Sequence, residues 1–241
     1  MSRPFVSVIV PSYNRRDFLP YLLHQFNYQT YPKERMELII IDDSPKSNAD
    51  IMPKDDVRVK YIHLTEKIPL GKKRNMLNSM AKGDIIVCMD DDDYYSPDRV
   101  SHAVTKLVAS KALIAGSTVL HIYYPQLEGS GKPTIYQFGP YNPTHSTGGL
   151  MAYKKEYIKT HSFPDDANKA EESQFTNKFT EPMIQLDTFK VMLCIAHNNN
   201  TVEKTAFIPQ GKPTNIKLKD FFKKADKKMI ERIKQIGLSM K

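Results

Sequence analysis

The sequence lacks the features that mark membrane-spanning, disulfide-stapled and glycine-rich proteins. None of its apolar runs approaches the ~20 residues that a transmembrane helix requires. The two cysteines, Cys88 and Cys194, cannot form a disulfide framework, and neither has a second Cys or His at zinc-ligand spacing. With only 10 glycines, the chain has no flexible RGG-type segment. We therefore expect both thiols to be buried and reduced, in a cytoplasmic protein that is soluble or peripherally attached to a membrane.

The positive charge is concentrated at one end of the chain. The 241 residues carry a formal net charge of +8, of which residues 217–241 contribute +6. This segment predicts a basic amphipathic helix whose apolar side consists of Leu218, Phe222, Ala225, Met229, Ile233 and Ile236. We expect this helix to pack on its own domain or to self-associate with a second subunit, and a peripheral membrane contact is the alternative. The sequence contains no nucleic-acid-binding motif, so nucleic acid is not an expected partner.

Apolar strand-like runs alternate with helical patterns through the first half of the chain. Strands are predicted at 5–10, 38–41, 57–64 and 84–89, and helices at 17–29, 70–81 and 100–110. Gly83 is expected to cap the second helix at its C-terminus. Further along, 113–124 predicts one strand region and 125–143 predicts loops or a hairpin. Uniformly apolar strands that alternate with helices indicate an α/β fold with a mostly parallel sheet covered on both faces.

Polar clusters follow three of these strands. Pro11–Arg15 follows the first strand, Asp42–Asp43 the second, and four aspartates, Asp90–Asp93, the fourth. The carboxyl ends of parallel strands meet at one edge, where ligands bind in open α/β sheets. Adjacent carboxylates repel one another, and hard oxygen ligands suit Mg²⁺ or Mn²⁺. Because the basic cluster Gly71–Asn75 at a helix start favours phosphate, the set predicts a nucleoside diphosphate site. Solvated turns are the alternative for each cluster taken alone.

The order of these motifs resembles that of family 2 glycosyltransferases, which have the GT-A fold. The resemblance rests on residues 6–14, 40–44, 71–75, 82–86 and 89–93. It implies a Rossmann-like, mostly parallel sheet flanked by helices, with a smaller acceptor-side subregion. The domain would span 1–216, with a nucleotide-sugar-binding half at 1–95 and an acceptor half at 96–216, followed by the C-terminal helix at 217–241.

The resemblance implies roles for residues on the donor side. Pro11, Tyr13 and Arg15 would frame the nucleobase. Asp43, or its neighbour Asp42, would accept a hydrogen bond from uracil. Arg74 corresponds to a basic residue near the base and diphosphate, and Lys72 or Lys73 would assist it.

The run of four aspartates corresponds to the D-x-D signature of the family. Counted back from Ser96–Arg99, which resembles the usual continuation of that signature, the resemblance implies that Asp92 would be the metal-binding carboxylate and that Asp90 or Asp91 would face the ribose. The run leaves the register open by one residue, so Asp93 remains an alternative for the metal. His197 is the histidine expected to reach the metal or the diphosphate, and a structural or solvated side chain is its alternative.

The acceptor side is expected in the second half of the chain. Residues 147–153, 163–164 and 170–173 resemble the acceptor-side segment of the family, where a Glu-Asp pair supplies the catalytic base. Here the pair is Glu171–Glu172, and Glu172 is preferred by its position in the pair. An exposed helix turn is the alternative.

These residues predict an inverting, hexosyltransferase-type enzyme that depends on Mn²⁺ or Mg²⁺. It would move a sugar from a nucleotide sugar, expected to be UDP-linked, to a hydroxyl of a glycan, glycoprotein or lipid-linked acceptor. A sugar nucleotidyltransferase is one rival, but such enzymes carry a Gly-rich loop where this chain has Pro11–Arg15. A catalytically inactive nucleotide-sugar-binding protein is the other rival.

Overall fold

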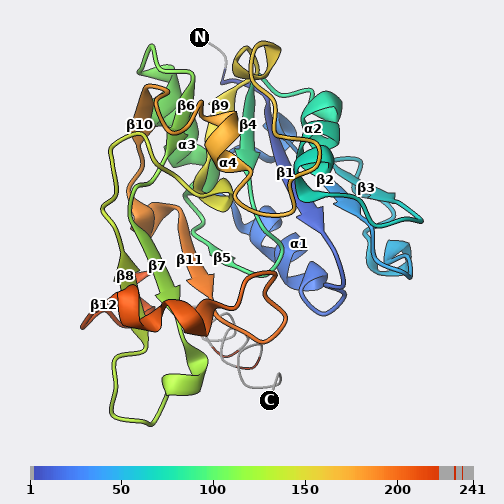
Figure 1. The fold of residues 1–241 in the computed structure, drawn as a ribbon. Helices are drawn as coiled ribbons and strands as arrows, with labels where there is room; N and C mark the ends of the chain where they lie inside the picture. The colour runs from blue at the N-terminus through green and yellow to red at the C-terminus, as the bar shows by residue number, and fades with distance from the viewer. Residues whose placement is uncertain (1–2, 223–230, 232–234, 236–241) are drawn as a thin grey trace.

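The computed structural model describes residues 3–222 together with residues 231 and 235, and these residues form two sheets that share one core (Figure 1). The seven-stranded sheet has the order β10-β6-β9-β4-β1-β2-β3. Its strands are β1 (Val6–Ser12), β2 (Met36–Asp42), β3 (Val59–His63), β4 (Ile85–Cys88), β6 (Ile114–Gly116), β9 (Ala152–Lys154) and β10 (Met183–Gln185). All neighbours in it pair in parallel except β9, which runs antiparallel to β4 and β6. The mostly parallel sheet is therefore confirmed.

A five-stranded sheet lies beside the first one, with the order β12-β8-β7-β11-β5. Its strands are β5 (Tyr94–Tyr95), β7 (Leu120–Tyr123), β8 (Ile135–Phe138), β11 (Met192–Ile195) and β12 (Lys212–Pro213). The strand region predicted at 113–124 consists of two strands, β6 and β7, which belong to different sheets. The chain turns at Ser117, whose side chain and amide bond to Val119 and Ser146 rather than to a ladder partner. Of the loops or hairpin expected at 125–143, the structure has a loop followed by β8, which pairs antiparallel with the preceding β7.

Within residues 3–222, four α-helices flank the sheets. They are α1 (Leu19–Tyr28), α2 (Leu70–Met80), α3 (Arg99–Val108) and α4 (Glu172–Phe175). In α3 the buried positions Val100, Ala103, Val104 and Leu107 follow the spacing of one helix face. Arg99, at the start of α3, is fully buried and donates to the carbonyls of Cys88 and Met151. It thereby ties α3 to the ends of β4 and β9.

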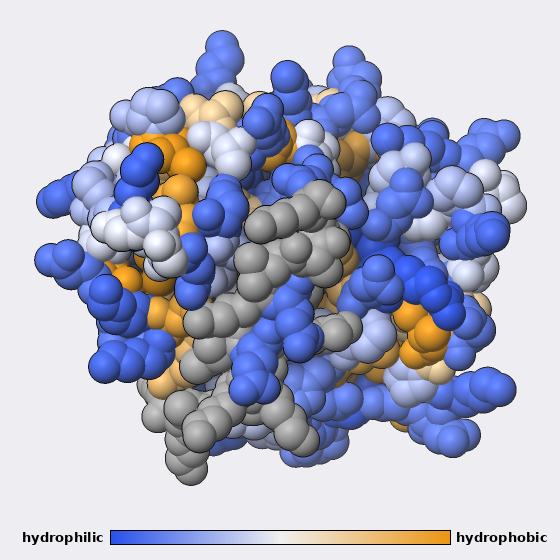
Figure 2. Space-filling model, turned by 90° about the horizontal axis from the view of Figure 1, so that it is seen from below, coloured by the Kyte–Doolittle hydropathy of each residue, from blue (hydrophilic) through white to orange (hydrophobic). Residues whose placement is uncertain are grey.

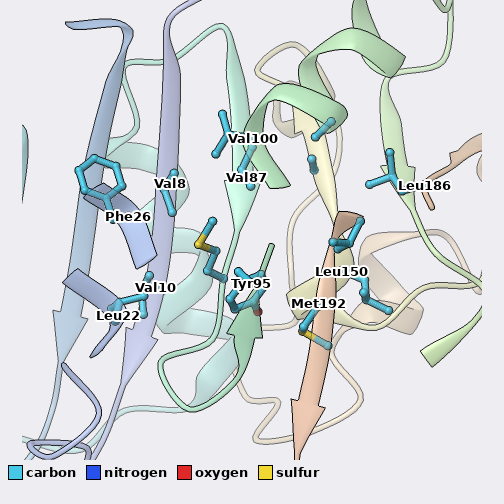
Figure 3. Close-up of a cluster of buried hydrophobic side chains, with 14 of the residues drawn as sticks. Val8, Val10, Leu22, Phe26, Val87, Tyr95, Val100, Leu150, Leu186 and Met192 are labelled. Carbon is cyan, nitrogen blue, oxygen red and sulfur yellow. The ribbon is translucent and has the colours of Figure 1, made fainter. Parts of the chain in front are cut away.

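The largest core cluster lies between the seven-stranded sheet, α1, α3 and the start of the second sheet (Figure 3). Val8, Val10 and Val87 meet Leu22 and Phe26 of α1 there. All seven residues of β2 are buried, as expected of a strand covered on both faces. Cys88 and Cys194 are both buried and free, as predicted.

Gly83 does not cap α2, contrary to the prediction. The helix ends at Met80. The next residue, Ala81, has ordinary extended backbone, and Gly83 has no positive φ. A Cβ on Gly83 would instead overlap the backbone nitrogen of Ser7 in β1. The glycine is required by close approach of two backbones rather than by helix termination.

The C-terminal segment is described only at its start. Leu218, Phe221 and Phe222 are buried against β7, β8 and β11. The remainder of the helix predicted at 217–241 lies outside the described residues, apart from 231 and 235, and with it the expected membrane contact or self-association. Among the residues that the structure describes, no helix is both long and apolar enough to cross a bilayer.

Candidate active site

The strand ends predicted to meet do lie together. The arrows of β1, β4 and β11 in Figure 1 point to the same side of the molecule. Ser12 ends β1, and its hydroxyl donates to Asp91 in the loop after β4, at 2.6 Å. Figure 2 views the molecule from that side and shows a mostly hydrophilic surface with hydrophobic residues in separate patches. The polar clusters of distant segments thus share one region.

The acidic run joins β4 of one sheet to β5 of the other, and each carboxylate has its own set of partners. Asp90 lies 3.3 Å from Arg74 of α2. Asp91 receives the Ser12 hydroxyl and lies 3.5 Å from Nε of Arg15. Asp93 accepts the backbone N–H of Ile195 at 2.8 Å, from β11. The four aspartates are therefore distributed around the junction of the two sheets rather than exposed together.

Asp92 is surrounded by groups from both sides of the site. Its Oδ2 lies 3.1 Å from Nε2 of His197 and 3.2 Å from Nη2 of Arg15. Asn200 donates to the same oxygen at 3.3 Å. The His197 side chain is fully buried and its ring packs on Phe18, with centroids 4.9 Å apart. The predicted pair of Asp92 and His197 is thus brought together by the structure.

Burial and charge act differently on the four carboxyl groups. Burial raises the pKa of Asp90, and burial together with the charge of Asp92 raises the pKa of Asp91 well above its ordinary value. Burial also raises the pKa of Asp93 to about 7. Burial opposes ionisation of Asp92 too, but the hydrogen bond from His197 and the charges of Lys204 and Arg15 outweigh it and lower its pKa. These contacts therefore favour the ionised form of Asp92, whereas burial disfavours the ionised form of the other three.

The two aspartates after β2 have different hydrogen-bonding capacity left. Both are buried. Asp42 accepts from Asn48 and Tyr61, each at 2.7 Å, and from both the amide and the hydroxyl of Ser44. Asp43 accepts the amide of Ile68 and the ammonium of Lys73. A carboxylate has about four acceptor positions, so those of Asp42 are filled and Asp43 has two to spare.

The basic cluster in α2 points in several directions. Lys73 is buried and also donates to the carbonyl of Ser12, so it ties β1 to β2 rather than facing a ligand. Lys72 is exposed. The amide of Gly71 donates to the carbonyl of Ala167 at 2.9 Å, so this amide of the first turn is already partnered. Beside the helix, the ammonium of Lys67 lies 4.0 Å from the ring centroid of Tyr13.

Arg74 connects the donor and acceptor sides of the site. Its Nε donates to Glu171 at 2.7 Å, and its Nη2 reaches Asp90. Both Arg74 and Glu171 are buried, and Nη1 of Arg74 has no hydrogen-bond partner among the described residues. Glu172 is only partly buried and accepts the amide of Gly148 at 2.7 Å. Burial and the neighbouring charge of Glu171 raise the pKa of Glu172, against the attraction of Arg74.

A cavity of about 360 Å³ adjoins the ends of β1 and β2. It is lined by Asn14, Arg16, Asp17 and Phe18 after β1, by Ser44, Pro45, Lys46 and Asn48 after β2, and by Asn199. Pro11 near the end of β1 and Tyr13 in the loop beside Asn14 are partly exposed. The loops that the sequence assigns to the nucleobase therefore border a cavity.

The residues present fit a divalent metal ion through two donors. Asp92 and His197 offer one carboxylate oxygen and one imidazole nitrogen that already lie 3.1 Å apart, and Mn²⁺ accepts both donor types. In the described part of the chain no group of three or more His, Cys, Asp or Glu side chains is arranged to hold a metal. A metal at this position would need further oxygens from phosphate or water.

Several residues of the site are not individually marked as functional by any motif or spacing pattern in the sequence. Ser12, Asn200 and Lys204 contact the acidic run, and Lys204 lies 3.6 Å from Asp93. Ser12 lies inside a segment already singled out. Asn200 and Lys204 lie in a polar stretch with the composition of an ordinary loop. Only their tertiary contacts show that they belong to the site.

The chain is similar to known glycosyltransferases. The model of the family described as Glycosyl transferase family 2 matches residues 7–162, more than half of the chain. A putative teichuronic acid biosynthesis glycosyltransferase, TuaG of Bacillus subtilis, is 34% identical over 102 residues, 41% of this chain and 40% of that protein. The poly(ribitol-phosphate) β-N-acetylglucosaminyltransferase TarS of Staphylococcus aureus is 26% identical over 187 residues, 71% of this chain and 32% of TarS. The chain thus spans less than half the length of either relative.

Solved structures of such enzymes share the fold. A mannosyltransferase of Pyrobaculum calidifontis, in complex with GDP-Man and Mn²⁺, superposes with a TM-score of 0.64 at 20% identity, covering 87% of this chain and 61% of that one. A fragment of S. aureus TarS in complex with UDP-GlcNAc gives 0.61 at 22% identity, covering 83% of this chain and 60% of the fragment. The chain belongs to glycosyl transferase family 2 and has the GT-A fold.

Proposed function

We propose that this protein transfers a sugar from a nucleotide sugar to an acceptor hydroxyl, with inversion at the anomeric carbon. The observation that carries the proposal is the Arg74 bridge, which joins Asp90 of the donor-side run to Glu171 of the acceptor-side pair. This bridge brings the carboxylates of the two halves to one guanidinium. A donor and an acceptor bound on its two sides would therefore meet.

The donor is proposed to be UDP-linked. Support comes from TarS, a relative whose fragment was solved with UDP-GlcNAc, and from the loops that border the cavity beside β1 and β2. Tyr13 offers a ring for the base, and Asp43 is the better candidate for uracil because its carboxylate retains free acceptor positions. Asp90 or Asp91 would face the ribose. The acceptor is proposed to be a hydroxyl of a glycan, glycoprotein or lipid-linked saccharide.

Glu172 is proposed as the general base. In the reaction the acceptor oxygen bonds to the anomeric carbon, the bond from that carbon to the phosphate oxygen breaks, and the hydroxyl proton passes to Glu172. Its raised pKa suits this role, since a base whose pKa lies closer to neutral accepts a proton more readily. Glu171, bound to Arg74, is proposed to orient that arginine. Arg74 and Lys72 would offset the charge of the leaving diphosphate.

A divalent metal is proposed to assist at Asp92 and His197. When bound, Mn²⁺ or Mg²⁺ would supply positive charge against the nucleoside diphosphate. The support is the donor set of these two side chains and the presence of Mn²⁺ in the related mannosyltransferase structure.

The base assignment is tested by Glu172→Gln. The amide keeps an oxygen that can accept the Gly148 N–H but cannot take up the proton, so we expect transfer to fall ~10²–10⁴-fold. Binding of UDP, measured by calorimetry, should stay within about twofold, because among the described residues the side chain of Glu172 bonds to the Gly148 amide and not to a residue assigned to the donor. The exposed Glu156→Gln serves as the matched control. Transfer at the wild-type rate in Glu172→Gln would exclude Glu172 as the base.

A separate assay tests the rival function. Release of pyrophosphate from a nucleoside triphosphate and a sugar phosphate would identify a nucleotidyltransferase instead.

A further inference from the structure

Lys204 has a largely buried side chain that the proposed reaction does not use. Its side chain is 17% exposed, and its ammonium lies 3.6 Å from Oδ1 of Asp93, which is 4% exposed. A lysine loses much hydration and side-chain freedom when it is buried. A lysine that served only to interact with solvent would stay exposed, so the partners of this side chain must compensate its burial.

Lys204 and Asp93 bind the two polar groups of one backbone residue. The carboxylate of Asp93 accepts the N–H of Ile195 at 2.8 Å, and the ammonium of Lys204 donates to the carbonyl of Ile195 at 3.3 Å. The backbone carbonyl of Lys204 in turn accepts the hydroxyl of Tyr124 at 3.0 Å. The residue is thereby anchored to the end of β11 and to the chain just after β7.

These contacts close the segment 197–203 at its base. The segment leaves β11 at Ile195 and returns to the same residue through Lys204. Between these points it supplies His197 and Asn200 to Asp92, and the carbonyl of Asn199 accepts Nη2 of Arg15 at 2.5 Å. The position of the segment therefore decides whether Asp92 meets its imidazole partner.

We propose that Lys204 is a positioning residue: by compensating the buried charge of Asp93 it keeps the segment 197–203 closed on Asp92. Without the ammonium, an ionised Asp93 is buried and unpaired, which is strongly unfavourable, and the carbonyl of Ile195 loses its donor. Both changes favour opening of the segment to water. Lys204 then acts on the site through Asp93 and the segment, without contacting the nucleotide. Only the use of the site for a nucleotide sugar rests on the proposed function.

Hydrogen exchange of the unliganded protein tests the position of the segment. The amides of His197, Asn199 and Asn200 have partners within the segment, whereas the amide of Ala196 bonds to Tyr123 of β7. In Lys204→Met we expect exchange of the three segment amides to rise at least ~10-fold, with Ala196 and α2 unchanged. Lys111→Met, which removes an exposed lysine, is the matched control and should leave all of them unchanged.

A double-variant cycle separates charge compensation from other roles. Asp93→Asn alone leaves Lys204 buried without its carboxylate and should also open the segment. Asp93→Asn combined with Lys204→Met removes both charges, keeps an acceptor for Ile195, and should restore wild-type protection. If the single variants fail to fold, recovery of the fold in the double variant is the expected outcome, and failure of the double variant as well would contradict the proposal.

Nucleotide binding distinguishes Lys204 from a direct ligand. UDP affinity in the presence of Mn²⁺ should fall about 10–100-fold in Lys204→Met and recover in the double variant. Three results would overturn the proposal. In Lys204→Met, hydrogen exchange of the segment amides could stay unchanged, or it could rise equally in β7 and α2. In a well-protected double variant, the UDP affinity could stay low. If the wild type binds no UDP while the exchange results hold, the proposed function fails and the positioning role of Lys204 stands.

Discussion

At the level of single residues, chemical environment separates side chains of the same type. Glu171 and Glu172 are adjacent, yet one is buried on Arg74 and the other is partly exposed on the Gly148 amide. Asp92 has its pKa lowered while that of Asp93 is raised to about 7. Only the partner that each side chain meets distinguishes the members of these pairs. The division of roles in the proposed mechanism follows those partners.

The coupling within the glutamate pair predicts a shift in pH dependence. Burial and then the charge of Glu171 raise the pKa of Glu172, and Arg74 lowers it. Glu171→Gln removes the like charge and leaves Arg74, so both effects lower the pKa of Glu172. Because the base is active when ionised, the acid limb of the kcat/KM profile should move to lower pH. Profiles of the wild type and the variant, measured on one donor and acceptor, decide this, and a limb that moves upward would show that Glu172 is not the group that titrates.

At the level of elements, α2 organises the site. Three consecutive residues of α2 bind three different parts of the chain. Lys73 binds the ends of β1 and β2, and Arg74 binds Asp90 and Glu171. Asn75 binds the loop at Phe163. Successive residues on a helix point about 100° apart, so a single turn can reach several neighbours. The helix must lie close to the loop 163–167 for these contacts to form.

Gly71 permits that close approach, and this predicts an unusual mutational effect. Helix propensity alone would make Gly71→Ala stabilising by ~1 kcal/mol. A Cβ there would overlap the backbone carbonyl of Pro164, however, and backbone cannot yield easily. We expect the variant to lose about 1–3 kcal/mol of stability. Thermal unfolding measures it, with the exposed Ser79→Ala of the same helix as a control that should change stability little; a stabilised Gly71→Ala would refute the contact.

At the level of the whole molecule, the site forms where two sheets meet. The acidic run passes from β4 of the seven-stranded sheet to β5 of the five-stranded sheet, and β5 pairs with β11. The segment that carries His197 follows β11, so both metal candidates depend on how the sheets are joined. Ligand binding across such a junction should stabilise the whole fold.

A thermal-shift experiment follows from this arrangement. Free ligand at about 100 times its Kd stabilises by ~2.7 kcal/mol, and each kcal/mol raises Tm by about 2–4 °C in a chain of this size. We expect UDP with Mn²⁺ to raise Tm by about 5–10 °C, more than GDP with Mn²⁺. In Asp92→Asn the additional rise in Tm that Mn²⁺ causes should disappear. Asp55→Asn, which changes an exposed aspartate, should keep this additional rise. Equal shifts with Mn²⁺ and with EDTA in the wild type would count against a metal at Asp92.

Local patterns determined much of the fold and the location of the site. The apolar strands, the helix of α3 and the polar groups after the strands depend on short-range spacing, which the sequence displays directly. The division of 113–124 between two sheets and the role of Gly83 could not be predicted in this way. Both depend on contacts with residues far away in the chain, Ser146 and Ser7.

The sequence by itself determined that this chain is an α/β glycosyltransferase-family protein with acidic and basic groups at its strand ends. Only the tertiary structure decided which partner each of those groups has. It placed Glu171 on Arg74, His197 on Asp92 and Lys204 beside Asp93. The physical reason is that these pairs lie far apart in the chain, so their energies depend on burial and distance in the folded state and leave no periodic pattern in the sequence.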